Sequence, residues 1–407
     1  MDRRGKVKNR TGQSPIIVVS RAMAEQAAGY NVYGFEFRVS GGCSFAREGL
    51  AEDFAYFAAG QTGPDAIELE LDEGEPDYRG LPECDARFYT PRNTVYCVNG
   101  TRYLDFGGRG LGTFEGAARR FAMRSADPHL VYEAAYLFLL SQIGQYGDAR
   151  GLHRLHALAM ERQGRAVLAL LPMGGGKSTL GAALLKRPEM RILSDDSPFI
   201  GRQGQALAFP LRLGLLEGRE EEAPAEHRRL VRRMEFGPKY LVNYSYFAGK
   251  VAKEAAPGLV LLGRRTLARE GRLEPASYTE TLKAMVPNLI VGIGLFQGLE
   301  YLLEHSAGEL ARKGGLGWSR LRNAHALIRR SKNYVFHMGR DVEANAQLVA
   351  ELAEREFEDP EAALTTLVLL ADALRSRWLR DLEPVDRWEE WVTTRDQVFR
   401  NLVRRPQ

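Results

Sequence analysis

Apolar and polar side chains alternate over short stretches in the first quarter of the chain. At 35–39 and 67–71 every second side chain is apolar, which is the pattern of a half-buried β-strand. An apolar run at 16–19 suggests a further strand, and glycine-rich joints at 41–42 and 107–110 separate such pieces. The pattern predicts a β-rich N-terminal zone, and we find no catalytic set of residues in it.

Helical periodicity begins later in the chain. Five apolar side chains fall near one face of the stretch 128–145: Leu130, Ala134, Leu137, Leu140 and Ile143. After Asp341 the pattern is helical to the end, with apolar stripes at 348–353, 364–378 and 388–402. Stripes of this kind are typical of a core or a subunit interface. We therefore give them no catalytic role and expect a homo-oligomer.

These patterns divide the chain into three parts. Residues 1–149 are expected to form a β-rich α+β domain that is accessory or specifies the substrate. Residues 150–342 alternate strands and helices and carry all the chemistry that we identify, and residues 343–407 form a helical C-terminal region. A length of 407 residues is compatible with two or three domains. The predicted fold class is mixed α/β.

Composition and charge exclude several classes of protein. With 44% hydrophobic and 27% charged residues, the chain is not largely disordered. Its 56 Lys and Arg against 52 Asp and Glu give a net charge of only +4, spread over the chain, so we expect no nucleic-acid partner. The mixed-charge stretch 217–233 is interpreted as a solvated loop leading into a helix, with a mobile flap as the alternative.

The cysteines and the apolar windows predict a cytoplasmic protein without a membrane span. Cys43, Cys84 and Cys97 form no CxxC pair, which favours a reducing compartment over a disulfide framework or a zinc site. The basic start at 1–10 has no apolar segment behind it, as a secretory signal would. The most apolar window, 284–303, is interrupted by proline, amide and acidic residues.

The strongest motif is a glycine-rich turn between a predicted strand and a predicted helix. An apolar run at 167–171 leads into Gly174, Gly175 and Gly176, and Lys177, Ser178 and Thr179 then open a helix. Glycines let consecutive backbone N–H groups close on phosphate oxygens, and a helix N-terminus adds unpaired donors. Lys177 would reach the β- and γ-phosphates of a nucleotide, and the Ser178 hydroxyl would bind Mg²⁺.

One position departs from the usual phosphate-loop pattern. The first glycine of that pattern would fall at position 171, where this chain has leucine. The alternative interpretation is a glycine-rich turn that only joins a strand to a helix. The order of apolar strand, three glycines, Lys-Ser-Thr and helix favours nucleotide binding.

Two adjacent carboxylates follow the next predicted strand. Asp195 and Asp196 stand 18 and 19 positions after Lys177. Carboxylates beside a phosphate loop can hold Mg²⁺ or accept a proton from an attacking hydroxyl. Successive side chains of an extended chain point to opposite sides, so we expect the two to divide these roles. Residue types alone leave open which one is the base.

A histidine is predicted to lie at the mouth of the phosphate loop. The stretches 155–160 and 166–171 are interpreted as a hairpin with Gln163 and Gly164 as its central turn residues. In that register His156 lies opposite Leu171, and a slip of one residue would abolish the relation. A structural role and a catalytic role for His156 are equally compatible with this position.

Together these residues resemble the HPr kinase/phosphorylase family. Its catalytic domain has a histidine-containing strand, a hairpin, a glycine-rich Lys-Ser loop and a strand ending in Asp-Asp, and His156, 174–178 and 195–196 follow that order. The stretches 210–214, 271–275 and 336–340 resemble later motifs of the group. The resemblance covers about 150–342 and implies a P-loop core like that of HPr kinases and phosphoenolpyruvate carboxykinases.

Two departures from the family pattern bear on function. Pro210 stands where the family signature has a metal-binding glutamate, so the Mg²⁺ shell must be completed otherwise, with Asp195 as the candidate. The region that would carry the family's phosphorolysis arginine corresponds to 286–289, which has none. We therefore expect a related kinase without phosphorylase activity.

The resemblance implies a role for each matched residue. Residues 174–179 bind the phosphates of ATP, and Lys177 neutralises charge on the transferred group. Ser178 and Asp195 hold Mg²⁺. Asp196 matches the family's second aspartate and is the candidate general base, assisted or oriented by His156. Arg212 would stabilise the equatorial oxygens. The stretch 236–240, with Lys239, is a second candidate contact, and a turn followed by a lysine on a strand is the alternative interpretation.

The predicted function is an ATP- and Mg²⁺-dependent phosphotransferase. The acceptor would be a hydroxyl of a small molecule, or of a Ser or Thr in a peptide or protein. A pocket closed by the N-terminal zone would favour a small metabolite, and an open groove would favour a peptide. The alternatives are a carboxykinase-like enzyme acting on an oxo-acid, which would need a second metal site, and a non-catalytic ATP-binding sensor.

Overall fold

The computed structural model describes residues 28–172, 174–215, 223–234, 237–290 and 307–357. The chain divides into two compact units, Met1–Ala353 and Glu354–Gln407. The predicted strand at 16–19 and the two predicted helices beyond residue 358 lie outside the described residues. The described part is mixed α/β with mixed sheets, as the sequence predicted.

The N-terminal zone forms one nine-stranded sheet in the order β3-β1-β2-β4-β9-β8-β7-β6-β5. Its strands are β1 (Ala28–Val32), β2 (Phe35–Ser40), β3 (Ala58–Ala59), β4 (Ile67–Glu73), β5 (Ala86–Tyr89), β6 (Thr94–Val98), β7 (Thr101–Asp105), β8 (Gly110–Glu115) and β9 (Arg120–Ser125). Strand β4 pairs in parallel with β2 and β9, and the other pairs are antiparallel. Buried positions alternate along β2 and β4, which confirms the two strands predicted from their period-two patterns.

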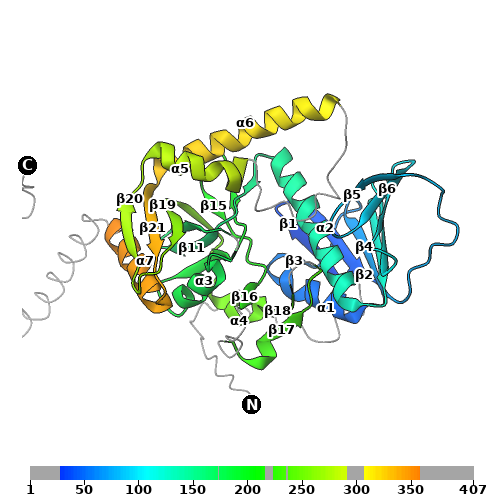
Figure 1. Cartoon of the computed structure of the whole chain (residues 1–407), viewed down its shortest axis with the longest axis horizontal. Coiled ribbons are helices and arrows are strands. Elements are labelled where there is room, and N and C mark those ends of the chain that lie inside the picture. The colour runs from blue at the N-terminus through cyan, green and yellow to red at the C-terminus, as the bar shows by residue number, and fades with distance from the viewer. Residues whose placement is uncertain (1–27, 173, 216–222, 235–236, 291–306, 358–407) are drawn as a thin grey trace, which may run out of the picture. The chain divides into compact units, whose positions relative to one another are not determined.

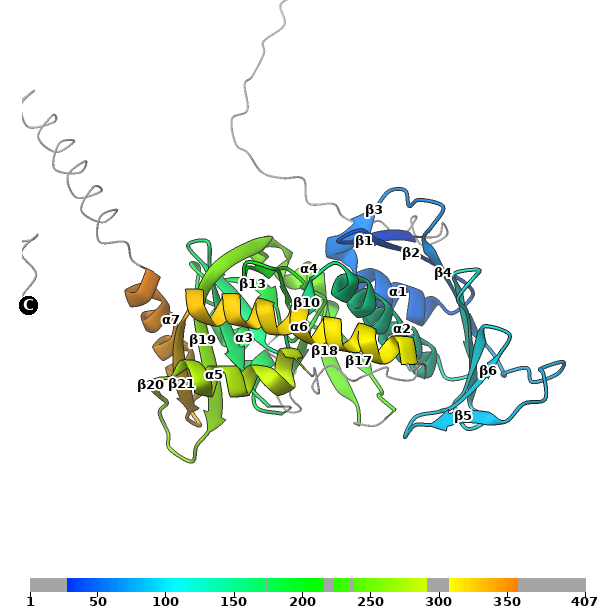
Figure 2. The ribbon, with the colours of Figure 1, turned by 90° about the horizontal axis from the view of Figure 1, so that it is seen from above.

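Two helices, α1 (Ser44–Asp53) and α2 (Pro128–Ala149), lie on one face of this sheet (Figures 1 and 2). Helix α2 begins where Pro128 occupies the first turn and the Asp127 carboxylate accepts a hydrogen bond from the His129 N–H at 3.0 Å. It confirms the helix predicted over 128–145 and continues to Ala149. Apolar residues on most of its circumference are buried, because α2 packs against the sheet, α1 and the next part of the chain.

The N-terminal zone and the following zone share a hydrophobic core. The buried cluster that contains Phe37, Leu69 and Phe138 also contains Phe199, Phe209 and Leu241 from beyond residue 150. Burial of large apolar side chains is the main favourable contribution to folding. The hydrophobic core therefore continues across the predicted domain boundary at 149/150.

A second nine-stranded sheet carries the predicted chemistry. Its strands are β10 (His153–Arg154), β11 (Leu158–Arg162), β12 (Arg165–Leu170), β13 (Arg191–Ser194), β14 (Phe199–Ile200), β15 (Ala206–Leu207), β19 (Glu254–Arg265), β20 (Arg272–Pro275) and β21 (Lys332–Met338). Strands β12, β19 and β21 are parallel neighbours. Strand β11 pairs antiparallel with β12, β13 pairs antiparallel with β11, and β20 pairs antiparallel with β21. Buried Leu168, Leu170 and Val260 belong to its core.

Helices cover both faces of this sheet. Helix α3 (Lys177–Leu185) lies on one side, and α5 (Tyr278–Met285) and α6 (Ala307–Arg330) lie on the other (Figure 1). The last strand is followed by α7 (Val342–Phe357), whose buried residues include Val349, Leu352 and Ala353. These three belong to the stripe predicted over 348–353. No helix in the described ranges is long and apolar enough to cross a membrane.

A small antiparallel sheet stands beside the phosphate-loop region, in the order β16-β18-β17. It is formed by β16 (Leu213–Leu215), β17 (Arg228–Val231) and β18 (Lys239–Val242), followed by the short α4 (Tyr244–Phe247). The remaining short elements are 3-10 turns at Ala55–Phe57, Ala225–His227 and Ala248–Lys250 and a π turn at Val286–Ile290. The helix expected at the end of the stretch 217–233 is wrong, because Arg228–Val231 pairs with β18 as a strand.

Candidate functional site

The hairpin that precedes the phosphate loop has the predicted register. Leu158 pairs with Ala169 and Arg162 with Arg165, so the residue numbers of each pair sum to 327. Gln163 and Gly164 form the turn with φ angles of 52° and 77°, which is the left-handed pair that a two-residue hairpin requires. The turn therefore sets the register of the whole hairpin and the position of the chain at both of its open ends.

At the open end of this hairpin, His156 and the phosphate-loop lysine meet. Lys177 Nζ lies 2.9 Å from His156 Nε2 and donates to the Leu171 carbonyl at 2.9 Å. The ammonium thus bridges the two positions that the sequence placed opposite each other. An ammonium group can only donate, so His156 Nε2 is the acceptor in this contact. Both side chains are buried, at 5% and 8% exposure.

The glycine-rich turn adopts a backbone that side chains would obstruct. Gly174 and Gly176 have φ angles of 71° and 96°, which favour glycine. A Cβ on Gly175 would lie 2.8 Å from the Pro172 carbonyl oxygen. Gly176 is the residue that precedes α3, so the N–H groups of the first helical turn, from Lys177 onward, have no partner within the helix. Such a turn is suited to binding an anion.

The leucine at position 171 has a packing explanation. Its side chain is 1% exposed and fills space above Gly263 of β19, where an added Cβ would lie 2.1 Å from Leu171 Cδ2. Its carbonyl oxygen is one of the acceptors for Lys177. The departure from the usual pattern therefore lies at the base of the loop, and Gly174–Gly176 form the turn that leads into α3.

The two aspartates face different partners, as predicted from their adjacency. Asp195 Oδ2 accepts a hydrogen bond from Ser178 Oγ at 2.7 Å, while Asp196 Oδ1 lies 3.6 Å from Lys177 Nζ and 3.3 Å from His156 Nδ1. Asp195 is 9% exposed, whereas the side chain of Asp196 is 55% exposed and faces the cavity. Asp195 therefore pairs with Ser178, and Asp196 pairs with Lys177 and His156.

The Asp195–Ser178 pair has the donor set that Mg²⁺ prefers. Asp195 Oδ1 is buried and has no hydrogen-bond partner, although its other oxygen is engaged. Burial raises the pKa of Asp195 in spite of the opposing effects of Lys239 and the Ser178 hydroxyl. An orphaned buried carboxylate oxygen beside a serine hydroxyl fits a hard cation with oxygen ligands. Among the residues that the structure describes, no group of three or more His, Cys, Asp or Glu is placed to hold a metal.

Asp196 is held in its charged form. Burial by itself would raise its pKa, but the His156 imidazole, the Lys177 ammonium and Lys239 together lower the pKa to about 2. The carboxylate is therefore ionised at neutral pH and available as a proton acceptor. It is also oriented toward the cavity in which a phosphate group on the loop would lie.

Arg212 is anchored to the N-terminal zone. Its Nη1 donates to Asp53 Oδ2 at 3.2 Å and to the Tyr132 hydroxyl, and its guanidinium lies 3.6 Å from the centre of the Tyr136 ring. Asp53 is fully buried and also accepts from Tyr132, at 2.6 Å, and from Arg229. Charge-assisted hydrogen bonds of this kind are shorter and stronger than neutral ones. They hold Arg212 in place before any ligand binds.

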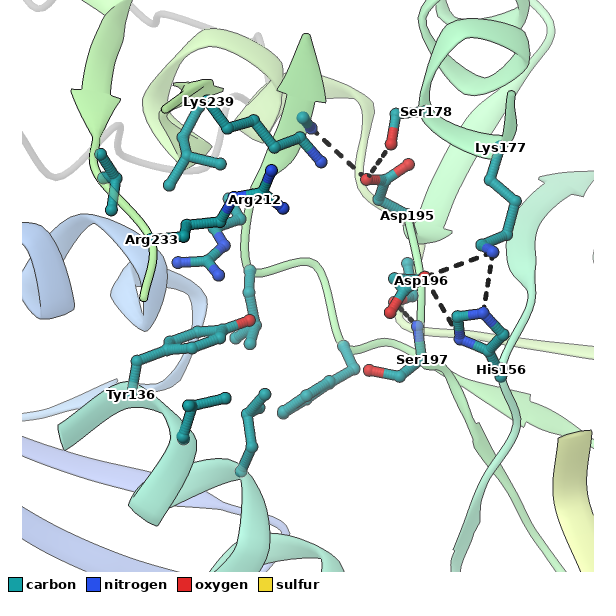
Figure 3. A pocket seen from close by; sticks show the side chains of 18 of the residues that line it. Tyr136, His156, Lys177, Ser178, Asp195, Asp196, Ser197, Arg212, Arg233 and Lys239 are labelled. Carbon is teal, nitrogen blue, oxygen red and sulfur yellow. Dashed lines mark hydrogen bonds and ion pairs between the residues drawn. The ribbon is translucent and has the colours of Figure 1, made fainter. Parts of the chain in front are cut away.

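The predicted site residues all line one cavity of about 250 Å³. Figure 3 shows Lys177, Ser178 and His156 on one side of Asp195 and Asp196, and Arg212, Arg233, Lys239 and Tyr136 on the other. The complete lining comprises Arg92, Tyr132, Glu133, Tyr136, Leu137, Leu140, Arg154, His156, Gly174, Gly175, Gly176, Lys177, Ser178, Thr179, Ser194, Asp195, Asp196, Ser197, Phe209, Leu211, Arg212, Gly214, Val231, Arg233, Lys239 and Leu241. The structure thus brings together every predicted site residue.

Sequence reasoning missed the wall that faces the phosphate loop. Tyr132, Tyr136 and Leu140 recur at intervals of four along α2, so their common face follows from helical spacing, but nothing local marks it as the wall of a site. Asp53 and Arg154 gave no signal at all, because each is a single charged residue without a motif. Lys239 was predicted as a second contact and lines the cavity beside Gly214, where a Cβ would lie 2.0 Å from Nζ.

No protein-family model matches this chain, and no curated protein sequence matches it either.

Proposed function

We propose that the protein is an ATP- and Mg²⁺-dependent kinase that transfers the γ-phosphoryl group to a hydroxyl of a small molecule. The observation that carries this proposal is the joint placement of Lys177, the Ser178–Asp195 pair and Asp196 around one cavity. These parts correspond to the phosphate clamp, the metal ligands and the proton acceptor of phosphoryl transfer. We also propose that residues 150–342 have the P-loop fold of an HPr kinase-like core.

Each residue has a task in the transfer. The turn at 174–176 and the N-terminus of α3 bind the phosphates, and the Lys177 ammonium offsets negative charge on the transferred group. Ser178 and Asp195 would hold Mg²⁺, which when bound neutralises charge on the β- and γ-phosphates. Lys239 and Arg212 face the same space from the opposite wall and supply further positive charge.

The proton balance of the reaction involves Asp196. The acceptor oxygen forms a bond to the γ-phosphorus while the bond from that phosphorus to the β–γ bridging oxygen breaks, and ADP leaves. The hydroxyl proton passes to the Asp196 carboxylate. A carboxylate with a pKa of about 2 is a weak base, so its main contribution is to orient the hydroxyl and to accept the proton late in the transfer. His156 positions this carboxylate at 3.3 Å.

The lining of the cavity favours a small acceptor. Arg92, Glu133, Tyr136 and Leu140 from the N-terminal zone form part of the wall, so the site is covered on the side away from the phosphate loop. A wall contributed by the N-terminal zone supports a small metabolite as the acceptor. A protein segment would have to displace side chains of α2, which are packed in the shared core.

The test uses the full chain with Mg²⁺, γ-labelled ATP and acceptor pools of small hydroxyl compounds and of Ser/Thr peptides. We expect label to pass to a small molecule. The variant Asp196→Asn should bind ATP normally and transfer about 10²- to 10⁴-fold more slowly. Asp65→Asn, at a side chain that is 84% exposed, is the matched control and should transfer at the wild-type rate. Undiminished transfer by Asp196→Asn would contradict the proton-acceptor role, and ATP binding with no transfer to any acceptor would indicate a sensor.

A further inference from the structure

Arg154 enters the cavity from a strand that the proposed phosphate and metal sites do not use. It belongs to β10, in which it pairs with Phe199 of β14. The preceding side chain, His153, is fully buried and points the other way, with Nδ1 2.8 Å from Asp148 and Nε2 2.9 Å from Ser319 Oγ. Arg154 and His156, two positions apart, both line the cavity.

The fold makes room for this guanidinium. In α2, the residue beside it is Gly144, and a Cβ there would lie 3.2 Å from both Arg154 Nε and Nη2. Any larger residue at 144 would press on the guanidinium. The arginine therefore occupies a slot between β10 and α2 with its charged end at the cavity.

Arg154 has no hydrogen bond or ion pair within the part of the chain that the structure describes. The two carboxylates whose charges act on it, Asp148 and Asp196, are engaged elsewhere. Asp148 is held by Arg320 at 2.6 Å and by His153, and Asp196 by Lys177 and His156. Burial lowers the pKa of Arg154. The guanidinium has lost part of its hydration, and no hydrogen bond from the described residues takes the place of the lost water.

Most of the other charged side chains in the cavity wall are also positive. Apart from the groups assigned to phosphate, metal and proton transfer, Arg212 and Lys239 among them, the charged side chains that line the cavity are Arg92, Arg154 and Arg233 and one carboxylate, Glu133. Glu133 itself accepts from the Met234 N–H at 2.5 Å. Such an excess of guanidinium groups in a partly dry site is matched to a carboxylate or a phosphate.

The position of Arg154 near the proposed proton acceptor suits a contact with the acceptor molecule and not with the nucleotide. Mg²⁺ would lie with Ser178 and Asp195, whereas the charge of Arg154 interacts with Asp196, the carboxylate that His156 contacts. One small molecule can therefore contact Arg154 and present a hydroxyl to Asp196.

From this arrangement we infer that the acceptor is a small anionic hydroxyl compound whose carboxylate or phosphate group is bound by Arg154. The inference rests on the proposed kinase function and specifies its substrate class. Arg154 sets which acceptor binds, and the apolar side chains of Leu137, Leu140 and Phe209 line the rest of the space.

The experiment measures acceptor binding separately from transfer. The full chain is loaded with Mg²⁺ and a non-hydrolysable ATP analogue and titrated calorimetrically with two charge-matched sets: glycerol, glycerate and glycerol 3-phosphate, and glucose, gluconate and glucose 6-phosphate. We expect the anionic members of at least one set to bind about tenfold or more tightly than the neutral member. Comparing the carboxylate compound with the phosphate compound in each set shows which of the two anions Arg154 binds.

Variants assign the effect to Arg154. Arg154→Gln should remove the preference for the anion and leave affinity for the nucleotide analogue within about twofold of the wild type. Arg154→Lys keeps the charge and should retain part of the preference, which also covers the case that the glutamine variant fails to fold. Arg79→Gln, at a side chain that is 91% exposed, is the control and should behave as the wild type.

The outcomes separate this inference from the proposed function. Equal binding of neutral and anionic members, binding of neither set, or a preference that survives in Arg154→Gln would overturn the assignment of the anion site. A bound anion to which no label passes from γ-labelled ATP would overturn the kinase proposal and leave the anion site standing. Failure of the nucleotide analogue to bind would remove both.

Discussion

Arg212 Nη1 lies 3.2 Å from Asp53 Oδ2, although the two residues are 159 positions apart in the sequence. Asp53 ends a helix of the N-terminal zone, and Arg212 lines the cavity next to the phosphate loop. Arg229 and Tyr132 contact the same carboxylate, so four polar side chains from both zones form one buried cluster. The N-terminal zone therefore contributes directly to the geometry of the candidate site.

Removing the Asp53 carboxylate should destabilise the protein and loosen the cavity wall. In Asp53→Ala two buried guanidinium groups lose their counter-charge, which we expect to lower the free energy of unfolding by about 3 to 5 kcal/mol. Urea unfolding monitored by tryptophan fluorescence measures the change. The control Asp65→Ala, at an exposed carboxylate, should change stability by less than about 0.5 kcal/mol. Similar values for the two variants would show that the cluster is not a stabilising unit.

Lys177 should be required for nucleotide binding. In Lys177→Met the charged contact to the phosphates is lost, which we expect to weaken MgATP affinity about 10- to 100-fold. Lys186→Met is a matched control just after the same helix, because its ammonium is 59% exposed and pairs with Glu343 instead. Affinities for a fluorescent ATP analogue give both values. A normal affinity in Lys177→Met would show that the glycine-rich turn only joins a strand to a helix.

Ser178 and Asp195 should set the requirement for Mg²⁺. In Ser178→Ala and Asp195→Asn we expect the Mg²⁺ concentration at half-maximal nucleotide binding to rise about tenfold or more, since each variant removes an oxygen ligand or its charge. Binding of the nucleotide in EDTA serves as the control and should change little. If both variants keep the wild-type Mg²⁺ dependence, the metal lies elsewhere.

The charged state of Asp196 predicts a pH dependence of stability at low pH. Its pKa is lowered from 3.8 to about 2 in the folded protein, so its ionic interactions stabilise the fold fully above about pH 4 and are lost as the pH falls toward 2. The unfolding free energy of the wild type minus that of Asp196→Asn should therefore fall across this window. The effect is small, because the side chain is 55% exposed and screened by solvent, and it should shrink further in high salt. A difference that stays constant or grows as the pH falls would contradict the interpretation.

The sequence predicted the local geometry of the candidate site well. The turn residues Gln163 and Gly164 set the register of the hairpin β11–β12, which leads into the phosphate loop. Asp195 and Asp196 have different partners, as expected for adjacent residues of an extended chain. Both follow from short-range rules, namely the left-handed φ angles of a two-residue turn and the alternation of an extended chain. The same rules do not extend to the end of the stretch 217–233, where a helix was expected and pairing with β18 produced the strand β17.

The sequence by itself determined the strand–glycine–helix turn, the hairpin before it and the two carboxylates after it, because each depends on residues close together in the chain. Only the tertiary structure decided that Asp53 anchors Arg212, that α2 forms the opposite wall, and that Arg154 faces the same cavity as His156. These relations arise from packing between segments far apart in sequence. Single charged residues such as Asp53 and Arg154 carry no periodic or local signal, and their roles appear only when the shared core brings the two zones together.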